Sequence, residues 1–124
     1  AMPLAVQGAF HSPLMGSARD GLEAALAGVE FRRAEVPVWA NATAAPYPSD
    51  AQAARKLLAA QVASPVRWAQ TLEGMAAQGI DTFIEVGPGK TLTGLVKRTL
   101  SEACALSCET PDDLAAVLAA LKED

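Results

Sequence analysis

The only histidine of the chain, His11, is the side chain best suited to acid–base chemistry. An imidazole can take up and return a proton near neutral pH. His11 lies between an expected strand over residues 4–6 and an expected helix start at Ser12-Pro13, where α/β proteins often hold working side chains. A general base needs a nucleophile, and the sequence has no Gly-x-Ser-x-Gly turn to hold one. The residues alone therefore indicate half of a catalytic site, with a plain surface histidine as the alternative.

Gln61 is the second unusual polar residue. It follows Leu57 and Leu58 at helical spacing, on the side of an expected helix that should face the core. A buried amide without hydrogen bonds costs about 1–3 kcal/mol, so Gln61 needs partners. It either bonds backbone at a helix end or serves as a polar partner in a site. Asn41 raises a similar question, and there the pattern favours a turn.

The segment Gly87-Pro-Gly-Lys90-Thr91 ends like a phosphate-binding loop. The full pattern needs a glycine five residues before Gly89, and Ile84 stands there. A tight turn between a strand and a helix is therefore the preferred interpretation.

The two cysteines, Cys104 and Cys108, lie four residues apart in an apolar segment. In a strand they would be about 13 Å apart, too far for a disulfide. We expect free thiols and no metal site, since the histidine is distant in sequence.

The order of the expected elements predicts the fold class. Strands alternate with helices, which is typical of an α/β fold with a small, mostly parallel sheet and flanking helices. Residues 44–48 are expected to be a loop, and caps are expected at Ser12, Ser49 (with Gln52), Ser64 and Thr110. The expected strands cover residues 4–6, 36–39, 81–86 and 103–108.

Length and charge exclude several classes of protein. The chain has 124 residues, enough for one domain, and a net charge of −4. Basic residues do not cluster, which disfavours a nucleic-acid partner. No apolar run approaches the roughly 20 residues of a membrane span, and no signal peptide is visible. We therefore expect a cytoplasmic protein without a membrane partner.

Several segments together resemble a known family. They are Phe10-His-Ser-Pro-Leu-Met15, Val36-Pro-Val with Asn41, Gln61 with Ser64-Pro-Val-Arg-Trp68, Met75-Ala-Ala-Gln-Gly79, and Glu85-Val-Gly-Pro-Gly-Lys-Thr-Leu-Thr-Gly-Leu-Val-Lys-Arg98. In order and spacing they resemble the C-terminal part of bacterial malonyl-CoA:acyl-carrier-protein transacylases. The last segment favours the free-standing enzyme of fatty-acid biosynthesis over the acyltransferase domain of a polyketide synthase.

The resemblance implies the C-terminal part of a hydrolase-like, three-layer α/β acyltransferase domain. Residues 1–10 would be the exit strand of an inserted ferredoxin-like subdomain and the lead-in to the active site. Residues 11–124 would form the C-terminal half of the large α/β subdomain. The parent enzyme would move malonyl from coenzyme A to the phosphopantetheine thiol of acyl carrier protein, by a ping-pong mechanism through a malonyl-serine ester. It would need no cofactor, because the coenzyme A thioester is a substrate.

The resemblance also assigns residues. His11 matches the catalytic histidine, Gln61 matches the glutamine that accepts a hydrogen bond from it, and Phe10 matches a bulky residue that leaves little room for a methyl branch on the substrate. The nucleophilic serine, the arginine that pairs with the malonyl carboxylate and the oxyanion glutamine have no match here. We therefore expect a fragment that is inactive alone and has the missing N-terminal part as a partner. A polyketide synthase acyltransferase piece and a non-catalytic module that binds carrier protein are the alternatives.

Overall fold

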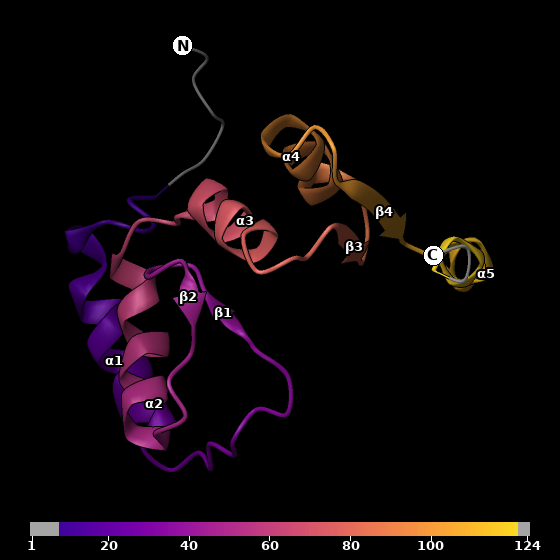
Figure 1. The fold of residues 1–124 in the computed structure, drawn as a ribbon. Helices are drawn as coiled ribbons and strands as arrows, with labels where there is room; N and C mark the ends of the chain where they lie inside the picture. Colours follow the sequence, from indigo (N-terminus) through magenta and orange to yellow (C-terminus); the bar gives the residue numbers. More distant parts are fainter. Residues whose placement is uncertain (1–7, 122–124) are drawn as a thin grey trace. The chain divides into compact units, whose positions relative to one another are not determined.

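The computed structural model describes residues 8–121, so the expected strand over residues 4–6 and most of residues 1–10 lie outside the described residues. The chain forms two compact units, Ala1–Thr71 and Leu72–Asp124, with helix α3 (Trp68–Ala76) spanning the boundary between them. Figure 1 shows the elements of both units in chain order.

Two helices that lie side by side build the first unit. The 3₁₀ turn η1 (Pro13–Met15) leads into α1 (Gly16–Leu26), and α1 packs against α2 (Ala51–Ala60) and the 3₁₀ turn η2 (Gln61–Ala63) (Figure 1). Ser12 caps η1 as expected, because its Oγ accepts a hydrogen bond from the Leu14 N–H at 3.3 Å. The packing of these helices places His11 next to Val62 in η2, about 50 positions later in the sequence.

A short hairpin replaces the expected strand over residues 36–39 and the expected loop over residues 44–48. Strand β1 (Trp39–Ala40) pairs antiparallel with β2 (Ala45–Pro46). Ala44 turns the chain with a φ of 52°, and the Tyr47 N–H donates to the Val38 oxygen at 2.8 Å. Pro37 has no N–H to donate, which explains why regular pairing begins only after it.

The second unit follows the expected parallel arrangement. Strands β3 (Thr82–Val86) and β4 (Cys104–Cys108) pair in parallel, with Phe83 opposite Ala105 and Glu85 opposite Ser107. Helix α4 (Thr91–Thr99) connects them and packs on both strands, and α5 (Pro111–Ala120) packs on β4. The buried Val96 faces this small sheet from α4. The α/β class with a small parallel sheet and flanking helices is therefore confirmed.

Of the four expected helix starts, those at Ser12 and Thr110 agree with the structure and two differ. Thr110 is the N-cap of α5 as expected, and it also forms a capping box with Asp113. Helix α2 is capped by Asp50 and not by Ser49, because the Asp50 carboxylate accepts a hydrogen bond from the Ala53 N–H at 2.7 Å. Ser64 starts no helix, since its hydroxyl donates back to the Ala60 oxygen and α3 begins only at Trp68.

The remaining local expectations have clear outcomes. Cys104 and Cys108 are free thiols on β4. The turn after β3 uses positive φ at Gly87 (133°) and Gly89 (90°), which supports the tight-turn interpretation. Within residues 8–121, no helix is long and apolar enough to cross a membrane.

Candidate active site

His11 sits in a strained turn that is stabilised from both sides. Its φ is 59°, in the left-handed region that non-glycine residues rarely adopt. The neighbouring Ser12 hydroxyl donates to the Ala9 oxygen at 2.7 Å and accepts from the Leu14 N–H. This turn presents an exposed imidazole at the start of η1. Such strain persists only where surrounding contacts over-determine it, and it concentrates at functional sites.

Two hydrogen bonds join His11 to η2. Its backbone N–H donates to the Val62 oxygen at 3.2 Å, and its ring Nδ1 lies 3.1 Å from the Gln61 main-chain oxygen. A carbonyl oxygen can only accept, so Nδ1 must carry the proton of this bond. The neutral imidazole then has an unprotonated Nε2, which faces away from this bond and can act as a base.

Gln61 meets His11 through its backbone and not through its side chain. The side-chain Oε1 accepts a hydrogen bond from the Asn41 N–H at 2.7 Å, and Nε2 donates to the Tyr47 hydroxyl at 2.5 Å. The side-chain amide of Gln61 thus bonds Asn41 and Tyr47, and the main-chain oxygen of Gln61 is the group that meets His11. Gln61 is half-buried, so each of these partners replaces water.

Sequence reasoning missed Tyr47 and gave Asn41 only a turn role. Asn41 contributes main-chain groups, its N–H to Gln61 and its oxygen to the Arg67 N–H at 2.9 Å. Tyr47, the only tyrosine of the chain, follows β2, and burial raises the pKa of its hydroxyl. The hydroxyl therefore stays protonated at neutral pH. No short-range motif marks Tyr47, because its partner lies 14 positions away.

Phe10 directly precedes His11 and is 58% exposed. Its ring folds back over Gly8, so that a Cβ at Gly8 would lie only 2.7 Å from Phe10 Cε2. Gly8 has a φ of 138°, which also favours glycine. A glycine at position 8 therefore leaves the Phe10 ring the space that it occupies.

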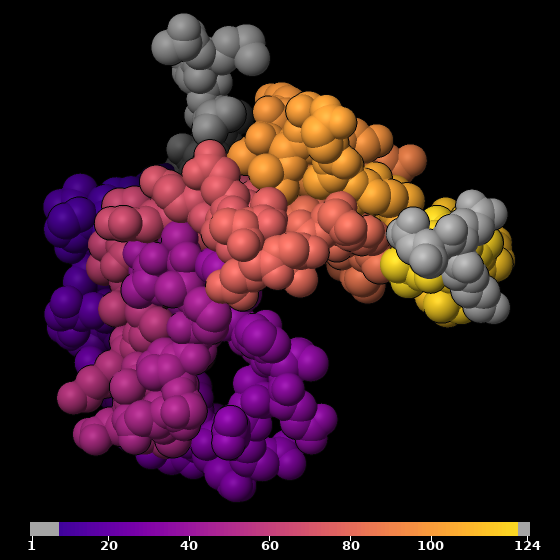
Figure 2. All heavy atoms as spheres, in the orientation of Figure 1, coloured from indigo at the N-terminus to yellow at the C-terminus, as the bar shows by residue number. Residues whose placement is uncertain are grey.

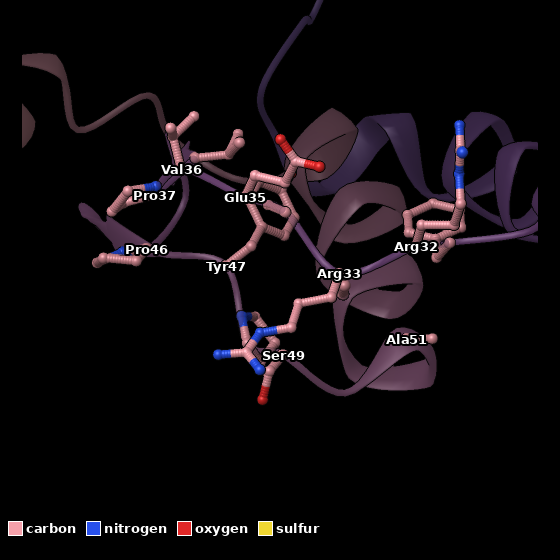
Figure 3. A pocket seen from close by; sticks show the side chains of 14 residues that line it. Arg32, Arg33, Glu35, Val36, Pro37, Pro46, Tyr47, Ser49 and Ala51 are labelled. Atoms are coloured by element: carbon pink, nitrogen blue, oxygen red, sulfur yellow. The ribbon is translucent and has the colours of Figure 1, made fainter.

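A cavity of about 410 Å³ lies in the first unit beside the hairpin, with Pro46 and Tyr47 among its lining residues. The space-filling view shows the hollow between the purple loop of residues 31–38 and the segment that leads into α2 (Figure 2). Tyr47 stands among its lining side chains, with Arg33, Glu35 and Ser49 (Figure 3). Neither His11 nor Gln61 lines the cavity, so only Tyr47 is common to it and the histidine site.

The turn after β3 is occupied by the protein's own carboxylate. Glu85 accepts hydrogen bonds from the Leu92 N–H at 3.0 Å, the Thr93 N–H at 2.7 Å and the Thr93 hydroxyl at 2.7 Å. The bonds from Thr93 are the main reason that the pKa of Glu85 lies below its ordinary value. The N–H groups that a phosphate would need at the start of α4 are therefore already bonded to an anion.

The described residues form no cluster of three or more histidine, cysteine or acidic side chains that could hold a metal ion. Within residues 8–121, the imidazole of His11 has its Nδ1 proton placed by the Gln61 main-chain oxygen.

Comparison with known proteins gives this arrangement a context. The acyl transferase domain family is matched over residues 2–123. The chain is 37% identical over 124 residues to the malonyl CoA-acyl carrier protein transacylase of Bacillus subtilis (strain 168), which covers all of this chain and 39% of that protein. A crystal structure of the malonyl CoA-acyl carrier protein transacylase from Clostridium perfringens superposes with a TM-score of 0.91 at 33% identity, covering 98% of this chain and 38% of that one.

A third relative is solved as a complex. It is a type II PKS acyl-carrier protein with its malonyl-transacylase, similar at a TM-score of 0.80 and 36% identity, covering 99% of this chain and 38% of that chain. The chain thus spans about two-fifths of the length of these relatives. Since the family match covers nearly every residue, the chain belongs to the acyl transferase domain family.

Proposed function

We propose that this chain supplies the base of a malonyl-CoA:acyl-carrier-protein transacylase that acts in fatty-acid biosynthesis in the cytoplasm. The observation that carries the proposal is the hydrogen bond from His11 Nδ1 to the Gln61 carbonyl, which leaves Nε2 free to accept a proton. The names of the relatives supply the substrate class, malonyl-CoA and acyl carrier protein. The nucleophilic serine comes from sequence other than these 124 residues, which contain no serine elbow.

In the first half-reaction, Nε2 of His11 takes the proton of the serine hydroxyl as the serine oxygen attacks the malonyl thioester carbonyl. The C–S bond then breaks, and the imidazolium returns the proton to the coenzyme A sulfur. The Gln61 carbonyl keeps its bond to Nδ1–H throughout, so the ring keeps the orientation that presents Nε2. The product of this half-reaction is a malonyl-serine ester.

In the second half-reaction the same nitrogen takes the proton of the carrier protein's phosphopantetheine thiol. The sulfur attacks the ester carbonyl, the C–O bond to serine breaks, and the serine oxygen recovers the proton from His11. No resident cofactor is needed, since both thiols belong to substrates. Phe10 directly precedes His11 in the chain and, in this proposal, limits space for a methyl branch next to the carbonyl.

The domain assignment of the sequence is part of this proposal. Residues 1–10 lead from an inserted subdomain into the site, and residues 11–124 belong to the large α/β subdomain. The missing N-terminal part, the carrier protein and malonyl-CoA are the partners. The complex of a relative with an acyl-carrier protein supports the carrier protein as one of them.

A chimera tests the function. These 124 residues replace the matching segment of the Bacillus subtilis relative, and malonyl transfer from malonyl-CoA to holo acyl carrier protein is measured. We expect activity in the chimera, its loss in His11→Ala, and its retention in Cys104→Ala, which changes an exposed residue of β4. The 124-residue chain alone should be inactive. A folded but inactive chimera, or transfer by the pure chain that His11→Ala abolishes, would contradict the proposal.

A role in polyketide biosynthesis is the second candidate, favoured by the relative bound to a type II PKS carrier protein. A chimera that malonylates a polyketide carrier protein much faster than a fatty-acid carrier protein would favour it. A chimera that binds carrier protein without transferring malonyl would instead favour a non-catalytic module.

A further inference from the structure

Tyr47 touches the site without reaching His11. Its hydroxyl accepts a hydrogen bond from Gln61 Nε2 at 2.5 Å, and Gln61 Oε1 accepts from the Asn41 N–H at 2.7 Å. The Asn41 N–H can only donate, so the amide oxygen must face Asn41 and the amide nitrogen must face Tyr47. The orientation of the Gln61 side chain is therefore fixed by the protein itself.

The hairpin holds this amide at both ends. Asn41 follows β1 at the turn end of the hairpin and Tyr47 follows β2 at its open end, so the two partners of the Gln61 side chain come from opposite ends of the β1–β2 pair. The main-chain oxygen of the same Gln61 accepts from His11 Nδ1 and also from the Ser64 N–H at 3.2 Å. One residue thus joins the hairpin to the histidine.

We propose that Tyr47 is a positioning residue, whose hydroxyl holds Gln61 so that the Gln61 carbonyl stays on Nδ1 of His11 and keeps Nε2 free to accept a proton. The inference deepens the proposed function and rests on it for the role of His11 as a base. Tyr47 makes none of the hydrogen bonds of His11, so its effect travels through Gln61.

The position of Gln61 at a helix end explains why its main-chain oxygen needs a side-chain anchor. Gln61 lies where α2 gives way to η2, and its N–H is shared between the Ala59 and Leu57 oxygens. Its carbonyl points outside the regular α-helical ladder, toward Ser64 and His11. Helix ends fray more readily than helix interiors, so a side-chain anchor restricts this carbonyl more than it would in mid-helix.

The test uses the 124-residue chain, whose single histidine gives one pair of imidazole ¹⁵N resonances. Their shifts report the ratio of the Nδ1–H to the Nε2–H tautomer in the neutral ring. We expect mainly Nδ1–H in the parent chain. Tyr47→Phe should lower the tautomer ratio about fivefold, which equals about 1 kcal/mol, the net value of one neutral hydrogen bond.

Two further variants separate positioning from loss of structure. Gln61→Met should shift the ratio in the same direction, and adding Tyr47→Phe to it should change nothing more, because the two act in one path. Phe31→Leu, at another lining residue of the cavity beside Tyr47, should leave the ratio unchanged. The backbone amide spectrum shows whether each variant is folded, and Gln61→Met carries the test if Tyr47→Phe does not fold.

An unchanged tautomer ratio in folded Tyr47→Phe would overturn the inference, as would an equal shift in Phe31→Leu. Because the readout is a tautomer and not a rate, it separates this inference from the proposed function. A shifted ratio together with an inactive chimera would keep the positioning role and remove the enzymatic one.

Discussion

The cap of helix α2 offers a test of the structure against the sequence pattern. The pattern Ser49 with Gln52 predicts a capping box, whereas the structure places Asp50 at the cap, with an extended φ of −73° and ψ of 123°. Its carboxylate accepts from the Ala53 N–H at 2.7 Å. A carboxylate is a stronger acceptor than a hydroxyl at the positive end of a helix, which explains the choice.

The expected magnitude follows from these contacts. Asp50→Ala removes the cap bond, a loss of about 1 kcal/mol. It also removes a negative charge from the helix N-terminus, a further loss of about 0.3–1 kcal/mol. The free energy of unfolding should therefore fall by about 1.5 kcal/mol. Asp50→Asn keeps an acceptor oxygen and loses only the charge, so its effect should be about half as large.

Urea unfolding followed by circular dichroism measures the difference. With a urea dependence of about 1–3 kcal/mol per M, Asp50→Ala should lower the midpoint by about 0.5–1.5 M. Ser49→Ala is the matched control, one residue away, and should stay within about 0.5 kcal/mol of the parent chain. A larger loss for Ser49→Ala than for Asp50→Ala would refute Asp50 as the cap of α2 and favour the capping box of Ser49 with Gln52.

Three further predictions concern other parts of the chain. The pKa of Glu85 is lowered in the folded chain, so its contribution to stability is present above the ordinary pKa of 4.5 and is lost as pH falls through the lower folded pKa. Glu85→Gln should therefore weaken the dependence of the melting temperature on acid pH. An unchanged dependence would contradict the role of the hydrogen bonds between Glu85 and Thr93. Val96→Ala empties a site that is 3% exposed and should cost about 2 kcal/mol in urea unfolding, so a loss below about 0.5 kcal/mol would show that the α4 packing is wrong. Gly8→Ala places a Cβ against the Phe10 ring and should raise the rate of methylmalonyl relative to malonyl transfer in the chimera, whereas an unchanged ratio would separate Phe10 from substrate selection.

Much of the second unit could be predicted from the sequence because its signals are local. Its signals involve residues only a few positions apart. They are the apolar runs of β3 and β4, the glycine turn between β3 and α4, and the cap of α5 at Thr110. The first unit is harder. Its hairpin depends on a positive φ at Ala44, a residue type that gives no turn signal.

Local signals also misplaced two helix starts. Ser64-Pro65 has the residue types of a cap and a first helical residue, yet the Ser64 hydroxyl donates to the Ala60 oxygen behind it. The Arg67 N–H donates to the Asn41 oxygen, and α3 begins only at Trp68. A serine followed by proline can cap a helix or bond back to the preceding turn, and tertiary contacts therefore decided which of the two occurs here.

The histidine site depends most on long-range contacts, because its hydrogen bonds connect residues 14, 20 and 50 positions apart. Two of the groups involved, the Gln61 oxygen and the Asn41 N–H, belong to the main chain, which every non-proline residue provides. Residue types alone therefore do not indicate these two contacts. The spacing of residues singled out Gln61 as a polar residue on a core-facing side, and only the family resemblance paired it with His11. Such main-chain contacts restrict the path of the backbone but require few particular residue types. Of the three residues around Gln61, only His11 and Tyr47 contribute side-chain groups to the network, so their substitution should reach the imidazole more directly than a change of the Asn41 side chain.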